Sequence, residues 1–324
     1  PTGVDFAKLK AELKHEHHQE EGTSLRTRLF GNVDRVNAVG SALAPVSNWA
    51  KKLPGSDLLA EKVLGIAPER DLPTFAPETL EEWFESRGPQ VAESEAADRV
   101  LLFPDTYTNF NHPEPGKAAV EVLEAANVHV RVADRSEIAP SGRAAFSMGL
   151  LDVAEERART NLDALSPYVE DGWSVLFVEP SDAAMFQDEY VDLLSDDRIE
   201  DLAVSAHGVC EYLNAYARLD GVAFDAPEED LTYHGHCNQK ALNRDHHAAA
   251  ALASAGYAVD ALDSSCCGMA GSFGYEAEHY DLSKAIGRIL HAKVRDSPGE
   301  TVVAPGASCR TQLSARSEER RVGK

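Results

Sequence analysis

The sequence predicts an α/β fold, in which two similar (duplicated) units with mostly parallel strands and flanking helices follow a helical N-terminal segment. Three observations predict it. From about residue 98, short apolar runs alternate with helical patterns, as in parallel sheets covered on both faces. The same order of elements then recurs as a second unit of roughly a hundred residues. With 324 residues, the chain is also long enough to bury the core of two domains.

The first part of the chain, residues 1–95, is predicted to be helical and connective. A polar helical pattern covers residues 5–21, and a more apolar one with Leu and Val near helical spacing covers residues 33–53. Residues 65–89 are rich in Pro and charge, which predicts a linker with one short helix.

Each predicted unit contains three apolar strand patterns separated by helices. The first unit, residues 96–195, has its strands at 99–104, 128–133 and 173–180, and its helices at 116–127 and 148–169. The second unit, residues 196–315, begins with a helical stretch at about 199–218. Its strands are predicted at 231–235, 257–263 and 300–306, and its helices at 244–256 and 278–294.

The two units also match in detail. When "PSGRAAFSMG" is set against "CCGMAGSFGY", and "VLFVEPSDAAMF" against "VVAPGASCRTQL", Gly142 falls on Gly268 and Asp182 on Cys309. Gly142 and Asp182 are 40 residues apart in the first unit, and Gly268 and Cys309 are 41 residues apart in the second. The spacing predicts a duplication at the scale of a domain.

The charge limits the classes of partner. The formal net charge is −23, with 54 Asp and Glu against 31 Lys and Arg. Such a surface repels phosphates and anionic headgroups, which excludes a nucleic-acid partner. The acid is dispersed along the chain, as suits a salt-rich cytosol, so we expect a halophilic source and a cytoplasmic protein, or one peripheral at the inner face of the cell membrane.

Four of the five cysteines follow predicted strands of the second unit. Cys237 lies in "HGHC", Cys266 and Cys267 lie in "DSSCC", and Cys309 lies in "PGASC". Parallel strands end at one edge of a sheet, so three loops are expected to bring four sulfurs together. Four thiolates are the ligand set of a zinc ion or an iron–sulfur cluster. Cys210, on a helical pattern, is expected to be a buried small hydrophobe.

Neighbouring residues favour an iron–sulfur cluster over zinc. Two tandem cysteines reach two irons of a cluster with less strain than one small tetrahedral ion. Gly268, with Gly271 and Gly274, would let the backbone approach a bulky cofactor with N–H groups directed at its sulfurs. We expect His236 to act near the cofactor through a hydrogen bond, and Arg310 to offset the charge of a thiolate cluster.

Three alternatives remain at this point. The sulfurs could hold a structural zinc that clamps three loops, carry out thiol–disulfide exchange at the tandem cysteines, or be buried and reduced without a metal. In the first unit the matching positions are Pro140, Ser141 and Asp182, with Asp105 near the position of Cys237. We therefore expect the first unit to be a scaffold, with capping or turn roles for the two carboxylates. No residue is assigned a catalytic role.

The pattern Cys, then "CCG", then "SCR", each after a strand, resembles the cysteine-rich CCG domain. That domain occurs in the B subunit of heterodisulfide reductase, in the iron–sulfur protein of glycolate oxidase and in the C subunit of anaerobic glycerol-3-phosphate dehydrogenase. "SCCGMAGSFGYE" with "SCRTQ" is most similar to fused FAD and iron–sulfur oxidases of the D-lactate or D-2-hydroxyglutarate dehydrogenase type. The family motif ends in C-x-x-C, which is absent here, so the resemblance leaves a four-thiolate site, expected to hold a [4Fe-4S] cluster.

The resemblance implies the electron-transfer end of a flavin-dependent 2-hydroxyacid dehydrogenase. FAD would be bound in a missing N-terminal part, and the electrons would pass through ferredoxin-like domains of the same or a partner chain. The acceptor would be a quinone or an electron-carrier protein. "PTGVDFAKLKAEL" resembles the segment after the last ligand cysteine of such a ferredoxin-like domain. Residues 316–324, "RSEERRVGK", match the translation of a sequencing adapter and are expected to be an artefactual tail.

Overall fold

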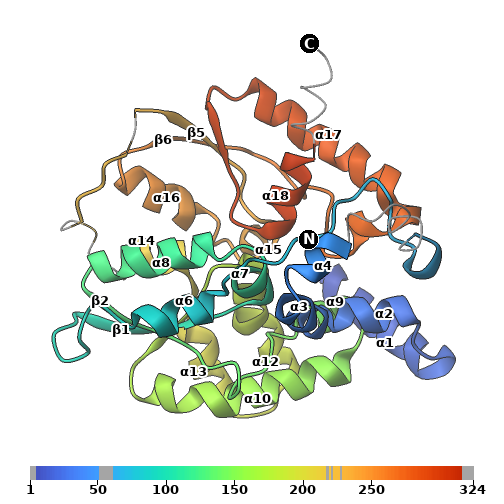
Figure 1. The fold of residues 1–324 in the computed structure, drawn as a ribbon, viewed down its shortest axis with the longest axis horizontal. Helices are drawn as coiled ribbons and strands as arrows, with labels where there is room; N and C mark the ends of the chain where they lie inside the picture. The colour runs from blue at the N-terminus through green and yellow to red at the C-terminus, as the bar shows by residue number, and fades with distance from the viewer. Residues whose placement is uncertain (1–4, 51–60, 217–218, 220–221, 227, 316–324) are drawn as a thin grey trace.

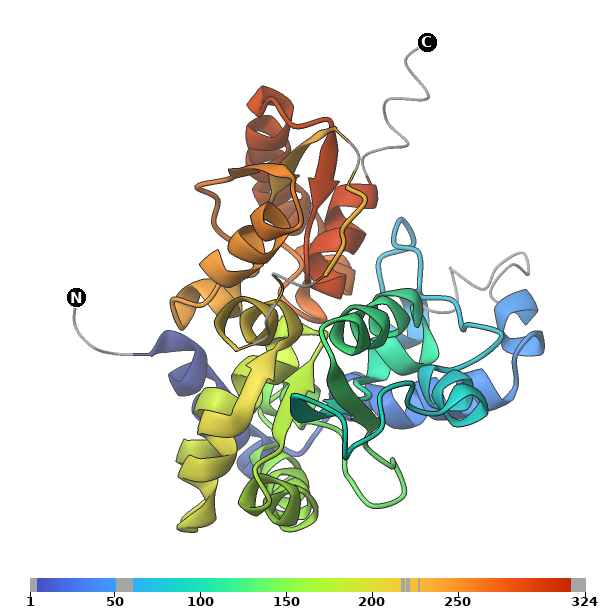
Figure 2. The ribbon, with the colours of Figure 1, turned by 90° about the vertical axis from the view of Figure 1, so that its left-hand side faces the viewer.

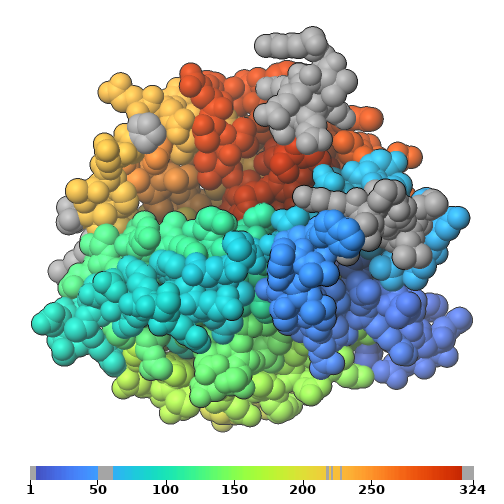
Figure 3. Space-filling view, in the orientation of Figure 1, coloured from blue at the N-terminus to red at the C-terminus, as the bar shows by residue number. Residues whose placement is uncertain are grey.

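The structure, a computed structural model, describes residues 5–50, 61–216, 219, 222–226 and 228–315. Its elements form an N-terminal helical segment, a first α/β unit and a second α/β unit (Figure 1). Figure 3 shows the second unit, in orange to red, above the first unit, which is mostly teal and green, with the blue N-terminal helices beside the first unit. The predicted tail and the first four residues lie outside the described residues.

The first sheet has four parallel strands in the order β2-β1-β3-β4. These strands are β1 (Asp98–Phe103), β2 (Val128–Val132), β3 (Ser174–Phe177) and β4 (Ala206–Gly208). Strands of a sheet covered on both faces are apolar along their whole length, and residues 100–103 of β1 are all buried. Leu101 and Phe103 pack against the long helix α10 (Leu151–Glu170), while Val100 and Leu102 pack on the opposite face.

Helices cover both faces of this sheet. Besides α10 they are α7 (Thr106–Phe110), α8 (Glu114–Ala125), α9 (Arg143–Ser147), α11 (Pro180–Ala184), α12 (Tyr190–Leu193), α13 (Arg198–Ser205) and α14 (Val209–Ala215), with a π-helical turn at Met185–Glu189. Residues from α8 and α14 complete one core, and residues from α10 and α13 complete the other. The first unit therefore has a substantial core on each face.

The second sheet has three parallel strands in the order β6-β5-β7. They are β5 (Asp230–Tyr233), β6 (Ala258–Ala261) and β7 (Thr301–Val303). The helices of this unit are α15 (Cys237–Ala241), α16 (His246–Ser254), α17 (Tyr280–Asp296) and α18 (Ala307–Ser314), with 3₁₀ turns at Phe273–Tyr275 and Ala277–His279. Figure 2 shows this sheet and its helices above the first unit.

The predicted α/β class, the parallel strands and the helical N-terminal segment are confirmed. The order β6-β5-β7 repeats the order β2-β1-β3, as expected of matching units, although the duplication itself stays a prediction. The structure differs at Ala206–Gly208, which was expected within a helical stretch and instead adds β4 to the first sheet. A three-residue strand with the sequence Ala-His-Gly carries too short a pattern to be recognised.

The N-terminal segment contains α1 (Phe6–Glu21), α2 (Leu25–Gly31), α3 (Val33–Ala42), α4 (Val46–Ala50) and α6 (Leu80–Arg87). Asp5 caps α1 by accepting from the N–H groups of Ala7 and Lys8. The segment also contacts the second unit directly. Ile66 forms an antiparallel bridge with Glu276, which lies just after the glycine-rich loop of that unit.

Arg70 strengthens this connection from a buried position. Its Nε donates to the carbonyl oxygen of Gly274 at 2.8 Å, its Nη2 donates to Ser283 Oγ at 3.0 Å, and its guanidinium lies 5.1 Å from the ring centroid of Tyr280. Residues 65–89, which were predicted as a linker, thus hold the glycine-rich loop in place and are called the strap below.

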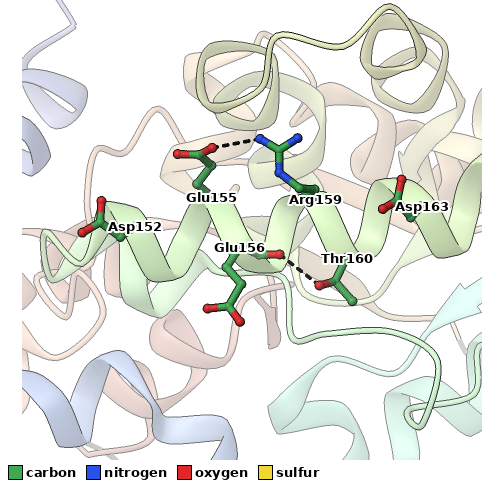
Figure 4. A pocket seen from close by; sticks show the side chains of 6 residues that line it. All are labelled: Asp152, Glu155, Glu156, Arg159, Thr160 and Asp163. Carbon is green, nitrogen blue, oxygen red and sulfur yellow. Dashed lines mark hydrogen bonds and ion pairs between the residues drawn. The ribbon is translucent and has the colours of Figure 1, made fainter.

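The outer face of α10 illustrates the acidic surface. Asp152, Glu156 and Asp163 are exposed around a shallow hollow, where Glu155 pairs with Arg159 at 2.9 Å (Figure 4). This is a solvated helix face and not an enclosed site. Among the described residues, no helix has the length and apolarity needed to cross a membrane.

Replacing Arg70 by Met should loosen the strap. Arg70→Met keeps the length of the side chain but leaves the Gly274 carbonyl and the Ser283 hydroxyl without their charged donor. We expect a loss of about 2–3 kcal/mol in the free energy of unfolding, measured by denaturant titration. The same substitution at Arg28, an exposed residue of α2, is the control and should cost less than about 0.5 kcal/mol. Equal losses for the two variants would contradict this interpretation.

Candidate metal centre

The three strand-end loops of the second unit bring four thiols together. Cys237 follows β5, Cys266 and Cys267 follow β6, and Cys309 follows β7. The thiols form a row in which Cys237 contacts Cys266, Cys266 contacts Cys267, and Cys267 contacts Cys309. The sequence therefore predicted which sulfurs meet, while their role as metal ligands stays a prediction. Cys210 is half-buried on α14, and burial raises its pKa to about 11.

Two of these thiols lie in the first turn of a helix. Cys237 is the first residue of α15, whose N-cap His236 accepts from the Asn238 N–H through Nδ1 at 3.3 Å. Cys309 is the third residue of α18. Partial positive charge at a helix N-terminus stabilises a nearby thiolate, so both helices favour negative charge at the sulfurs.

Gly268 fits the tandem-cysteine loop because it has no side chain. Its φ is +98°, and a Cβ there would lie 2.5 Å from the carbonyl oxygen of Ser283. Its N–H donates to Cys266 Sγ at 3.3 Å, which agrees with the expectation that backbone N–H groups face the sulfurs. Gly271 also has a positive φ but open space around it, and at Gly274 a Cβ would meet the sulfur of Met269.

The four thiols share protons unequally. Hydrogen bonds from Cys237 and Cys267 lower the pKa of Cys266, and a hydrogen bond from Cys267 lowers the pKa of Cys309. The pKa values of Cys237 and Cys267 are raised, chiefly because each donates to Cys266. The group thus stabilises thiolate at two sulfurs even without a cation, and thiolates are the form that binds metals.

Two histidines lie beside the sulfurs. His234 Nδ1 is 2.6 Å from Ser264 Oγ, while its buried Nε2 makes no hydrogen bond of ordinary geometry and lies close enough to Cys309 to lower the pKa of that thiol. His236, 5% exposed, affects the pKa of both Cys309 and Cys266, and burial lowers its own pKa. His236 thus lies at the centre as expected, and its contact with a cofactor stays a prediction.

Arg310 is directed at the backbone. Its Nη1 donates to the carbonyl oxygens of Ala304 and Pro305, and its charge acts on the carboxyl of Glu179. That it offsets the charge of a cluster stays a prediction.

Glu179 is the residue that the sequence did not single out. It follows β3 of the first unit, and its Oε2 accepts from the Ala307 N–H at the start of α18 at 2.8 Å. Its Oε1 lies 4.0 Å from His236 Nε2. Burial raises its pKa. No local pattern marks such a residue, because its partner at Ala307 lies more than a hundred residues away.

At the carboxyl edge of the first unit, a hydrogen bond between oxygen atoms lies where the second unit has a contact between two thiols. Ser141 Oγ donates to Asp182 Oδ1, at the two positions that match Cys267 and Cys309. Asp105 caps α7 by accepting from the N–H groups of Tyr107 and Thr108, at 3.0 and 2.9 Å, which is the expected capping role. A serine–carboxyl hydrogen bond thus occupies the place of a thiol–thiol contact.

These carboxyls are buried and raise one another's pKa. Burial and the neighbouring Glu179 raise the pKa of Asp105 to about 6, and its Oδ2 has no hydrogen-bond partner. Burial and Asp105 raise the pKa of Asp182 well above its ordinary value. The pKa shifts at this edge thus favour protonated carboxyls, whereas those in the second unit favour thiolate at Cys266 and Cys309.

Comparisons with known proteins identify the second unit. Residues 231–314 match the family model described as a cysteine-rich domain, CCG. The matched residues lie within the second unit and include Cys237, Cys266, Cys267 and Cys309. The chain is 27% identical to the C subunit of the anaerobic glycerol-3-phosphate dehydrogenase of Escherichia coli (strain K12), over 90% of this chain and 73% of that protein. The predicted resemblance is confirmed.

Larger proteins also match almost the whole chain. It is 24% identical to the D-2-hydroxyglutarate dehydrogenase of Escherichia coli (strain K12) and 22% identical to that of Haemophilus influenzae, over 97% of this chain in both cases. The chain spans 31% and 32% of the length of those proteins. It therefore corresponds to about a third of each.

Asp105→Asn should flatten the dependence of stability on pH. The folded pKa of about 6 lies above the ordinary 3.8, so the contribution of this carboxyl is fully present below pH 4 and is lost as pH rises through 6. Asn keeps the helix cap but has no proton to lose. Between pH 4 and pH 7 we expect the wild type to lose about 2 kcal/mol more unfolding free energy than the variant. Parallel pH profiles from denaturant titrations would refute the assignment.

Gly268→Ala should destabilise the second unit more than Gly271→Ala. Both positions have a positive φ, but only Gly268 would place a Cβ against backbone. We expect Gly271→Ala to cost about 1 kcal/mol and Gly268→Ala about 2–4 kcal/mol of unfolding free energy. Hydrogen exchange followed by mass spectrometry should locate the difference in the loop 264–276. Equal effects would show that the close approach to Ser283 carries no cost.

Proposed function

We propose that this chain is the electron-transfer portion of a flavin-dependent dehydrogenase and that its four-thiolate site holds a [4Fe-4S] cluster. The observation that carries the proposal is the meeting of four thiols from three strand-end loops, within the residues that match the cysteine-rich domain. Both groups of relatives are dehydrogenases or parts of dehydrogenases, so the chain is part of an oxidoreductase.

The spacing of the sulfurs supports a cluster over zinc. Four sulfurs around a tetrahedral zinc lie about 3.8 Å from one another, since each Zn–S bond is about 2.3 Å long. Among the described residues, however, the group of three potential ligands within 4.8 Å of one another is Glu276, Glu278 and His279, and no three of the cysteine sulfurs meet that limit. The sulfurs form a row that does not close around one point, which disfavours a single tetrahedral ion and leaves a group with several irons as the better candidate.

The chemistry of the surrounding residues fits such a group. All four cysteines are free, and the Gly268 N–H already donates to Cys266 Sγ. The unpartnered Nε2 of His234 faces Cys309 and would donate to its thiolate. When bound, an iron–sulfur cluster accepts and releases single electrons. The protein residues supply the thiolates, the hydrogen bonds that stabilise their charge, and a site that excludes water from Cys267 and Cys309.

The electrons would come from a flavin, on an FAD-linked oxidase domain of the same or a partner chain, through ferredoxin-like domains. We propose a 2-hydroxy acid as the substrate, such as D-2-hydroxyglutarate, D-lactate or glycolate, and a quinone or a carrier protein as the acceptor. A second candidate substrate is glycerol 3-phosphate, because the chain covers 73% of the C subunit of that dehydrogenase but 31% of a D-2-hydroxyglutarate dehydrogenase. The setting would be a salt-rich cytoplasm, or the inner face of the cell membrane.

Thiol–disulfide exchange is an alternative to the cluster, and the surroundings of Cys266 favour it. Cys266 is half-buried, and hydrogen bonds from its neighbours lower its pKa, as in reactive thiols. A structural zinc that clamps the three loops is the other rival.

One experiment separates these three functions. The protein is purified anaerobically in high salt, and iron, sulfide and zinc are measured together with the visible and electron paramagnetic resonance spectra. We expect about four iron and four sulfide per chain, with a paramagnetic signal on reduction. One zinc without visible absorbance would support the structural clamp and contradict the proposal. An absence of metal together with two fast-reacting thiols would support thiol–disulfide chemistry.

The fifth cysteine provides a matched control. Cys309→Ser should lower the iron content and the visible absorbance by at least half, because it removes one of the four thiolates. Cys210→Ser, on α14 and outside the row of thiols, should leave both unchanged. A loss of iron in both variants would indicate a general effect on folding.

A further inference from the structure

A cavity of about 320 Å³ lies at the carboxyl edge of the first sheet. The loops after β1, β2 and β3 form its floor, α2 and α3 form one wall, and loops of the second unit form part of its lining. It thus occupies in the first unit the position that the thiols occupy in the second. Its volume is within the range of sites for small organic ligands.

The wall formed by α2 and α3 is largely apolar, although Asp34 and Asn37 also line it. Its apolar side chains come from α2, α3, the strap and the residue just before the strap, and they are Leu29, Phe30, Val33, Leu64, Ile66, Leu72 and Phe75. Two arginines also line the cavity, but both are already neutralised. Arg157 pairs with Asp34 at 3.0 Å, and Arg143 pairs with Glu189. The cavity therefore offers little to an anion and favours a neutral, largely apolar ligand.

The floor supplies a buried hydrogen-bonding end. Asp182, 8% exposed, lines the cavity beside Ser141. Burial and the neighbouring Asp105 raise the pKa of Asp182 well above its ordinary value, which favours the protonated form of its carboxyl. A protonated carboxyl donates a hydrogen bond, and its natural partner is a neutral acceptor such as a carbonyl oxygen.

The cavity is adjacent to the row of thiols. Ala307 and Ser308 line it, and the next residue in the chain is Cys309, which is 1% exposed. Glu179 also lines the cavity and accepts from the Ala307 N–H. A ligand in the cavity would thus lie beside the turn of α18 that carries one of the proposed ligands.

We propose that this cavity binds the ring of a quinone, with a ring carbonyl directed at Asp182 and Ser141. An apolar wall, a buried hydroxyl and carboxyl, and an adjacent electron-transfer site are together what a neutral, planar, two-electron acceptor requires. This inference rests on the proposed electron-transfer function. Reduction of the quinone to the quinol takes up two electrons, supplied by substrate oxidation at the dehydrogenase, and two protons, supplied from water through the carboxyls of the floor.

The test is direct binding of 2,3-dimethyl-1,4-naphthoquinone, whose quinone ring has no position open to thiol addition. Binding to the oxidised protein is followed in high salt by isothermal titration calorimetry, without turnover. We expect saturable binding at one site per chain. Val33→Phe, which fills the cavity from α3, should weaken binding at least tenfold. Val39→Phe lies on the same helix but is 61% exposed, and it should leave the Kd unchanged.

Ala144→Leu is the second filling variant and is used if Val33→Phe does not fold, as judged by circular dichroism and the melting temperature. Equal affinity of the wild type and a folded filling variant would overturn the proposal, as would the absence of saturable binding up to 1 mM quinone. Neither result depends on the metal content. A failure here therefore leaves the iron–sulfur proposal standing, and zinc or no metal in the metal analysis leaves the quinone titration interpretable.

Discussion

The meeting of four thiols is the constraint on which the second unit depends. Its cluster of buried apolar residues consists of Cys267, Met269, Leu290, Ala304 and Cys309, so two of the proposed ligands are themselves core residues. The first sheet, by contrast, has an extensive core on each face. Leu231, Tyr233, Ala248 and Ala251 are also buried in this unit, and a small core of this kind is the setting in which a bound metal adds most to stability.

The rest of the molecule is arranged around these loops. The strap at Ile66 and Arg70 holds the glycine-rich loop from one side, and Glu179 holds the start of α18 from the first unit. Each contact joins a segment that contributes no thiol to a loop that does. The first unit and the N-terminal segment therefore both contact the loops that carry the thiols. A substitution that removes one of these contacts is expected to shift the position of those loops.

The fold was largely predictable because most of its strands and helices have a hydrophobic periodicity of their own. Strands such as Asp98–Phe103 and helices such as Leu151–Glu170 have periodicities that a single sequence reveals. The four cysteines could be grouped because the end of a parallel strand fixes the edge where its loop lies. Glu179 and Arg70 could not be found in this way, since their importance arises from partners far away in the chain. The strand β4 was not predicted, because its three residues are too few to show a hydrophobic periodicity.

The hydrogen bond between Ser141 and Asp182 has a consequence for how the protein is assembled. Thiolates are soft donors that favour iron, copper and zinc, whereas the hydroxyl of Ser141 and the carboxyl of Asp182 are hard oxygen donors that already bind one another. Two edges of similar topology thus present different donor atoms, sulfur at one and oxygen at the other. During maturation, donor chemistry would therefore direct a soft metal or a cluster to the edge of the second unit.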